Sequence, residues 1–100
     1  MKIMWILRST TLDKEQLVRL PTGTARTIGR GPRADFVIEA TLLSRVHCQL
    51  STTTNQLVVE DLKSTNGTYV NDTRVQCIAL NEGDCLRLGR VEFIVSREEQ

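Results

Sequence analysis

The sequence predicts an all-β protein, a two-sheet antiparallel β-sandwich built from short strands. Three observations predict this fold class. Short apolar runs, several of them with apolar and polar residues in alternation, recur along the whole chain. Turn-forming residues separate these runs at intervals of about eight to twelve residues, which is typical of a sandwich or a barrel. No segment has the apolar spacing of an amphipathic helix.

The size and composition indicate one domain. The chain has 100 residues, of which 40% are apolar and 4% aromatic, enough for one hydrophobic core and too few for two. We expect residues 1–96 to form this domain. Residues 97–100, Arg-Glu-Glu-Gln, are expected to be a solvated tail or the start of a linker.

The charge balance argues against some classes of partner. A formal net charge of +1 at pH 7 leaves no general basic face for nucleic acid or a membrane surface, although a local cluster of cations stays open. The apolar run at residues 1–7 is too short for a secretory signal or a membrane span. We therefore expect an intracellular protein, in the nucleus or the cytoplasm, with no direct nucleic-acid or membrane partner.

The cysteines form an odd and widely spaced set, Cys48, Cys77 and Cys85. Disulfide frameworks in small proteins use even numbers of cysteines, and free cysteine is among the most buried residue types. We expect three reduced, chemically idle thiols in the core.

The first half of the chain predicts two pairs of short strands. Residues 4–8 and 16–20 are apolar or alternating, and a loop at residues 9–15 and a turn at residues 21–23 bound them. The next strands are expected at residues 25–28 and 35–38. Between them lies Gly29-Arg30-Gly31-Pro32, and because no helix signal follows these glycines, the loop is not of the nucleotide-binding kind.

The second half continues the same pattern. Residues 46–50 alternate and pair, after a turn at residues 51–55, with a strand at residues 57–61. Turns at residues 71–72, 81–84 and 89–90 then separate strands at residues 74–75, 85–88 and 91–95.

Three loops carry more polar side chains than chain reversal needs. The clearest is the stretch from Lys63 to Asn71, where Ser64, Thr65 and Thr68 surround the Asn66-Gly67 turn. A turn needs a residue that tolerates positive φ, which this dipeptide supplies, but it does not need three hydroxyl groups. The other two loops contain Gly29-Arg30 and Ser44-Arg45-Val46-His47.

Together these loops resemble the forkhead-associated (FHA) domain, whose pattern is Gly-Arg, then Ser-Arg-x-His, then Asn-Gly-Thr with an Asn three residues later. The match runs from about Thr27 to Phe93 and includes the segment Asp84-x-Leu86-x-Leu88-Gly89. The resemblance implies a β-sandwich whose loops at one end bind a phosphothreonine in a partner protein.

The resemblance also assigns roles to individual residues. Arg30, Ser44 and Thr65 would bind the phosphate, while Asn66 and Arg45 would contact the peptide backbone beside it. The chemistry agrees, because a phosphate dianion is well matched by one guanidinium fork and small hydroxyl donors. An Asn side chain offers both a donor and an acceptor to an extended main chain.

Each of these residues also has a structural interpretation. Arg30 alone would be an ordinary exposed charge, and Ser44 and Thr65 would be ordinary turn residues. The combination of three loops favours phosphate binding. Asn66 and Gly67 form a turn in either case.

Four further residues are predicted to shape the loops, namely Gly29, His47, Gly67 and Asn71. His47 is the only histidine, which excludes a two-histidine metal site, and no group that would orient a Cys-His catalytic pair is apparent. We interpret it as a brace that hydrogen-bonds across the loop base, which is also its role in the family. No metal or cofactor is expected.

The segment before Ser44 is the predicted specificity loop. Leu42 and Leu43 stand where members of the family read the peptide a few positions after the phosphothreonine. Because the segment is apolar, the hypothesis is a preference for an aliphatic or other uncharged residue there.

These observations predict a non-enzymatic, phosphorylation-dependent adaptor, a monomer that binds a threonine-phosphorylated protein segment. The alternative is a phosphate-independent scaffold that dimerises through a sheet face of the same sandwich. The opening Met4-Trp5-Ile6-Leu7 also resembles, weakly, the N-terminal region of nibrin-type DNA-repair proteins.

Overall fold

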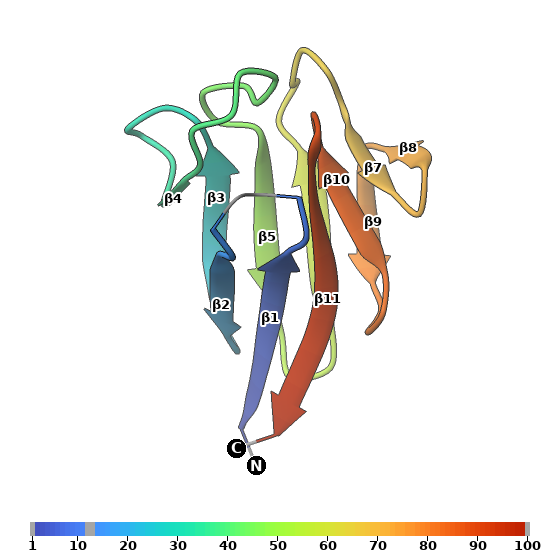
Figure 1. Cartoon of the computed structure of the whole chain (residues 1–100). Coiled ribbons are helices and arrows are strands. Elements are labelled where there is room, and N and C mark those ends of the chain that lie inside the picture. Colours follow the sequence, from blue (N-terminus) through green and yellow to red (C-terminus); the bar gives the residue numbers. More distant parts are fainter. Residues whose placement is uncertain (1, 12–13, 100) are drawn as a thin grey trace.

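The computed structural model describes residues 2–11 and 14–99, and in these residues the chain is a sandwich of two β-sheets (Figure 1). The six-stranded sheet has the order β2 (Leu17–Pro21), β1 (Ile3–Ser9), β11 (Val91–Glu99), β10 (Cys85–Leu88), β7 (Thr68–Val70), β8 (Thr73–Val75). The five-stranded sheet has the order β4 (Phe36–Val37), β3 (Ala25–Gly29), β5 (Cys48–Thr52), β6 (Leu57–Asp61), β9 (Cys77–Leu80). All pairs are antiparallel except β3 with β4. The predicted fold class is confirmed.

The core lies between the two sheets and follows from the alternation in the sequence. On β5 the buried residues are Cys48, Leu50 and Thr52, while Gln49 and Ser51 point outward. Side chains with no exposed surface come from both sheets, among them Leu7, Leu20, Ile28, Leu50, Val59, Leu86 and Phe93. Because side chains alternate between the two faces of a strand, each sheet contributes one apolar face to a shared core.

Three parts of the chain differ from the prediction. Strand β7 lies in the stretch from Lys63 to Asn71, which was interpreted as a polar turn. Strand β9 was not predicted, because Cys77–Leu80 is short and apolar without alternation. At the end of the chain, residues 97–99 continue β11 and pair with Trp5, Met4 and Ile3, so the paired backbone passes the predicted boundary of the domain. The guanidinium of Arg97 lies 5.6 Å from the centre of the Trp5 ring, a cation–π contact that adds to this pairing.

The cysteines are all free thiols, but only one is a core residue. Cys48 is fully buried, and this burial, with a smaller contribution from the Asp61 charge, raises the pKa of its thiol to about 12. It is therefore protonated and unreactive at neutral pH. The expectation that all three are buried is wrong, because Cys77 is exposed on β9 and Cys85 is half-buried on β10.

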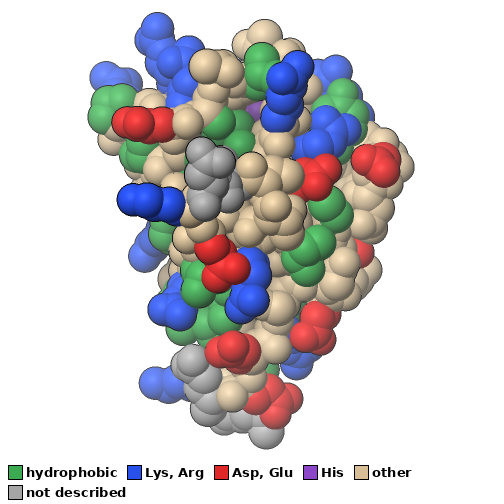
Figure 2. Space-filling model, in the orientation of Figure 1, with side chains coloured by type: hydrophobic (Ala, Val, Ile, Leu, Met, Phe, Trp, Pro, Cys, Tyr) green, Lys and Arg blue, Asp and Glu red, His purple; other side chains and the backbone are tan. Residues whose placement is uncertain are grey.

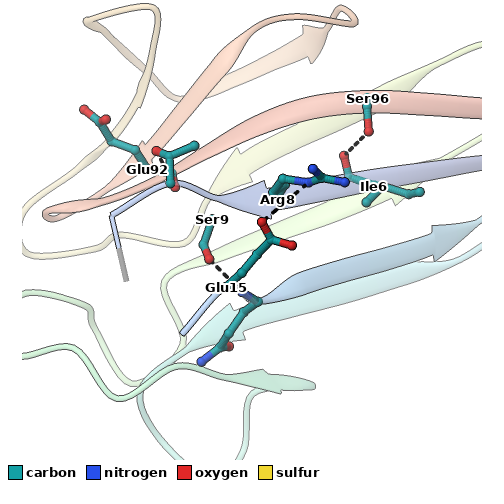
Figure 3. A network of polar contacts seen from close by, with 8 residues as sticks. Ile6, Arg8, Ser9, Glu15, Glu92 and Ser96 are labelled. Atoms are coloured by element: carbon teal, nitrogen blue, oxygen red, sulfur yellow. Dashed lines mark hydrogen bonds and ion pairs between the residues drawn. The ribbon is translucent and has the colours of Figure 1, made fainter. Parts of the chain in front are cut away.

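The connection between β1 and β2 is held against the six-stranded sheet by polar contacts (Figure 3). The Ser9 hydroxyl accepts the Gln16 N–H at 2.8 Å, and the Thr10 N–H donates to the Glu92 carbonyl at 2.9 Å. The Arg8–Glu15 ion pair in the same region spans 4.0 Å between side chains more than half exposed, so it contributes little. The sequence predicted a loop at residues 9–15, and this connection lies there, between the end of β1 and the start of β2. Residues 12–13 are outside the described part.

The loops and the chain ends lie at opposite ends of the sandwich (Figure 1). The connections β3–β4, β4–β5 and β6–β7 extend from one end, and both termini lie together at the other. Among the described residues, no helix long and apolar enough to cross a membrane is present.

A pair of neighbouring residues on β11 tests the assignment of the core. Phe93 is fully buried, whereas Ile94 faces outward and is 39% exposed. Phe93→Ala should lower the free energy of unfolding by about 3–5 kcal/mol, because it removes buried surface and leaves a cavity. Ile94→Ala should cost about 1 kcal/mol or less. Urea denaturation measures both, and equal costs would contradict the orientation of β11.

Candidate functional site

The candidate site is built by three loops, residues 30–35, 38–47 and 62–67. The first two lie against each other through backbone hydrogen bonds, from the Arg30 N–H to the Ser44 carbonyl and from the Gly31 N–H to the Arg45 carbonyl, each 3.0 Å long. Gly29 allows this approach, because a Cβ there would overlap the Arg45 carbonyl oxygen and lie 2.6 Å from its carbon. Any side chain at this position would push the two loops apart.

His47 connects the loops to one another and is fully buried. Its Nδ1 accepts the Ser44 N–H at 3.1 Å, and its Nε2 lies 2.8 Å from the Gly67 carbonyl oxygen. Because Nδ1 accepts a backbone N–H, the ring proton resides on Nε2 and is donated to Gly67. The backbone of His47 adds bonds to the Ile28 carbonyl and from the Leu62 N–H. One residue thus links the second loop to the third and to the end of β3, which leads into the first loop.

Two further hydrogen bonds join the second loop to the third. The Ser44 hydroxyl accepts the Thr65 N–H at 3.0 Å, and the Asn66 amide donates to the Leu42 carbonyl at 2.9 Å. The Ser44 O–H keeps its proton to donate, and exposed Asn66 keeps its side-chain oxygen and a second N–H. The Thr65 side chain is exposed beside them.

A buried carboxylate that the sequence analysis missed supports the third loop. Asp61 accepts hydrogen bonds from the Ser64 hydroxyl, the Ser64 N–H and the Thr68 hydroxyl. Ser64 in turn accepts the Gly67 N–H at 2.9 Å. Burial acts to raise the pKa of Asp61, but the hydrogen bonds from Ser64 and Thr68 outweigh it and lower the pKa below its ordinary value. Ser64 and Thr68, two of the surplus hydroxyls of this stretch, therefore serve the loop itself.

Arg30 is exposed at the start of the first loop, against the second. Its Nε donates to the Leu43 carbonyl at 2.7 Å, which fixes the side chain and leaves the two terminal nitrogens for a ligand. A cavity of about 380 Å³ lies beside it, lined by Arg30, Glu39, Ala40 and Thr41.

The predicted specificity loop is only partly on the surface. Leu43 is 2% exposed and packs in the core, so its side chain is not available to a peptide, and its role in the prediction is wrong. Leu42 is half-buried against Gly89. The exposed residues of this segment are Glu39 and Thr41, which are polar, and this weakens the hypothesis of an aliphatic preference.

Asn71 and Gly67 occupy special backbone positions. Asn71 has φ of +49° and ties the β7–β8 turn to β10, since its side chain accepts the Cys85 N–H at 2.9 Å and donates to Asp84 at 3.0 Å. Gly67 has φ of +89°, and a Cβ there would lie 2.9 Å from the Arg74 Nε. Neither residue faces the centre of the loops; both shape the elements around it.

The chemistry available at the loop end is that of an anion site. Four cationic residues are exposed there, namely Arg30, Arg33, Arg45 and Lys63. Figure 2 shows lysine and arginine side chains gathered at this end of the molecule. In the part of the chain that the structure describes, no group of three or more His, Cys, Asp or Glu residues could hold a metal ion. The local cationic cluster that the net charge left open is therefore present.

Comparison with known proteins agrees with this geometry. The family model of the FHA domain matches residues 26–89. Among curated proteins of Mycobacterium tuberculosis, the ABC transporter ATP-binding/permease protein Rv1747 is 38% identical over 92 residues, which cover 92% of this chain. The FHA domain-containing protein FhaA is 39% identical over 87 residues, which cover 78% of this chain. The chain spans only 10% and 16% of the lengths of these relatives.

Solved structures share the fold over nearly the whole chain. One, from an analysis of phosphothreonine-dependent FHA domain interactions, has a TM-score of 0.84 and 33% identity and covers 100% of both chains. The FhaA FHA domain complexed with the intracellular domain of Rv3910 has a TM-score of 0.80 and 35% identity, covering 93% of this chain and 98% of that one. Mycobacterium tuberculosis EmbR with a low affinity phosphopeptide also has a TM-score of 0.80, with 28% identity over 93% of this chain and 24% of EmbR.

The support that Asp61 gives to the third loop can be tested through pH. Asp61→Asn should lower the free energy of unfolding by about 1–3 kcal/mol at neutral pH, because the amide cannot accept all three hydrogen bonds. Folding depresses the pKa of Asp61, so its contribution is present above the unfolded-state pKa of about 4 and is lost as the pH falls through the lower folded-state value. Chemical denaturation from about pH 6 down to about pH 2 should show the gap between wild type and variant closing. A constant gap would mean that the charge of Asp61 plays no part.

Proposed function

The chain belongs to the FHA domain family, and we propose that its three loops bind a phosphothreonine within a segment of a partner protein. The observation that carries the proposal is Arg30, an exposed guanidinium fixed by its bond to the carbonyl of Leu43, the residue before Ser44. The Ser44 hydroxyl in turn accepts the Thr65 N–H. The family supports it, since FHA domains are binding modules, and one neighbour is EmbR in complex with a phosphopeptide.

The ligand chemistry follows from the donors that the loops present. A phosphothreonine carries close to two negative charges at neutral pH and strong acceptor oxygens. Arg30 offers paired N–H groups, and Ser44 and Thr65 offer hydroxyl donors from the two loops that face it. Asn66 and Arg45, at the rim, would contact the peptide main chain. Because the loops are already tied together, little conformational entropy is lost on binding.

The cellular role that this implies is a phosphorylation-dependent adaptor and not an enzyme. It would act inside the cell, in the nucleus or the cytoplasm, where the free thiols Cys48, Cys77 and Cys85 stay reduced. The partner is a threonine-phosphorylated protein segment, bound by a monomer. The likeness of residues 4–7 to nibrin-type DNA-repair proteins stays a prediction.

Arg30→Ala tests the proposal directly. Removing the guanidinium should weaken binding to phosphothreonine peptides from a degenerate library by about tenfold or more, because charge-assisted hydrogen bonds to the phosphate are lost. Fluorescence polarisation with phosphorylated and unphosphorylated versions of the selected peptides measures it. Arg26→Ala is the matched control, because Arg26 is an exposed arginine of β3 whose side chain, among the described residues, is recorded bonding to the Ala25 carbonyl alone.

Binding of partners that is equally strong for Arg30→Ala and indifferent to phosphorylation would support the phosphate-independent scaffold instead. Sedimentation of the wild-type chain as a dimer would strengthen that alternative.

The affinity should also depend on pH in a way set by the ligand. The second pKa of the phosphate is about 6, so a site that prefers the dianion loses affinity as the pH falls below that value. Titration calorimetry at about pH 7.5 and about pH 5 should show weaker binding at the lower pH. Equal affinities would contradict recognition of the dianion by Arg30 and Ser44.

A further inference from the structure

We propose that Arg33 and Arg45 form a second anion subsite, which binds a carboxylate or a second phosphate in the same partner segment as the phosphothreonine. The inference rests on the proposed function, because the subsite adjoins the three loops. It adds a rule of partner selection, namely that an acidic group beside the phosphothreonine strengthens binding.

The subsite is a cavity of its own. It measures about 490 Å³ and is lined by Gly31, Pro32, Arg33, Arg45 and Val46. It shares no lining residue with the cavity beside Arg30 and Glu39. Gly31 directly follows Arg30, and Arg45 directly follows Ser44, so a peptide with its phosphate on Arg30 and Ser44 has its neighbouring residues within reach of this cavity.

Local backbone structure places the two arginines. The Ala34 N–H donates to the Gly31 carbonyl at 3.2 Å, which closes a turn with Pro32 and Arg33 at its centre. Proline favours the second position of such turns, and buried Ala34 anchors the end, so the turn presents Arg33 outward. Arg45 lies against buried Gly31, where a Cβ would come within 2.9 Å of the Arg45 Cβ. The stem of Arg45 therefore rests on the same turn.

The two guanidinium groups have no carboxylate partner among the described residues. Asp35, the acidic residue closest to Arg33 in sequence, is engaged elsewhere, because its carboxylate accepts the Thr27 N–H at 2.9 Å and the Thr27 hydroxyl at 3.3 Å. The single ion pair recorded in residues 2–11 and 14–99 joins Arg8 to Glu15. An anion bound between Arg33 and Arg45 would relieve their mutual repulsion and use their paired donors.

The other cavity differs in charge, because it is lined by one arginine and one glutamate, Arg30 and Glu39. With the phosphate on Arg30, the Glu39 carboxylate would repel an acidic residue there, while the Arg33–Arg45 cavity attracts it. The two cavities together would favour partner segments whose charge is asymmetric about the phosphothreonine.

The experiment uses the chain of residues 1–100 and one phosphothreonine peptide with alanine and serine flanks. In two peptide sets, glutamate or phosphoserine replaces each of the four positions before and after the phosphothreonine in turn. On one side, both replacements should tighten binding to the wild type by about two- to fivefold, the range expected for exposed charge pairs. Comparison of the affinities of the glutamate set and the phosphoserine set shows whether the subsite prefers a carboxylate or a second phosphate.

Arg33→Gln should abolish this gain and leave the affinity for the neutral-flank peptide unchanged. Arg33→Lys should keep part of the gain, because it keeps the charge and loses the planar fork. Arg19→Gln, at an exposed arginine on β2 far from the loops, is the matched control for net charge and should keep the whole gain.

The outcomes separate this inference from the proposed function. If the neutral-flank phosphopeptide binds in a way that depends on Arg30, and acidic flanks do not strengthen that binding, the subsite is wrong and the proposed function stands. A gain that persists in Arg33→Gln overturns it as well. Binding of every peptide regardless of Arg30 overturns the proposed function.

Discussion

The loop end of this sandwich depends on the hydrogen bonds of one buried residue, His47. Its ring joins the Ser44 N–H to the Gly67 carbonyl, and its backbone joins Ile28 and Leu62. These partners belong to segments that are distant in sequence and that lead into different sheets. A buried imidazole with both ring nitrogens satisfied is held by its surroundings in one tautomer and one orientation, whereas leaving either nitrogen unpaired would cost about 1–3 kcal/mol. The loops therefore keep one arrangement because the alternative leaves buried polar groups without partners.

This arrangement would suit small polar side chains to the proposed binding of an anion. Ser44, Thr65 and Arg30 each have one hydrogen-bonding group engaged within the protein and another left exposed. The internal bonds hold the Arg30 guanidinium and the Ser44 hydroxyl in place and fix the backbone at Thr65. In the proposed function, the exposed groups would contact the phosphate. Asp61 supports the third loop from inside the protein, where hydroxyl and backbone donors stabilise its negative charge. A carboxylate can lie beneath the proposed anion site because both of its oxygens accept hydrogen bonds from the third loop and from Thr68.

The sequence predicts the sandwich and most of its strands, because alternation reports directly which face of a strand is buried. It predicts less where alternation is absent. Leu42 and Leu43 are chemically alike, and only the path of the loop decides that Leu43 enters the core. The apolar Cys77–Leu80 carries no period, so its place at a sheet edge, with Cys77 exposed, depends on pairing with β6. Asp61 was missed because it was interpreted only as the last residue of the strand at residues 57–61, although Ser64 and Thr68 had been expected to serve the loop itself. An Asp three residues before a Ser is a signal of a side-chain-capped turn that could have found it.

The pairing of β1 with β11 has a mechanical consequence. The two strands run antiparallel, and the first residue of β1, Ile3, lies opposite the last residue of β11, Glu99. Both residues lie at the end of the sandwich away from the loops. Any polypeptide joined to either end would leave in that direction and keep the loops clear. Tension on such flanking segments would act on the first rungs of the β1–β11 ladder one pair at a time, as in opening a zipper, and would reach the loop end last. The domain can thus serve as the free tip of a longer chain, with its weakest point under load at the attachment and not at the site.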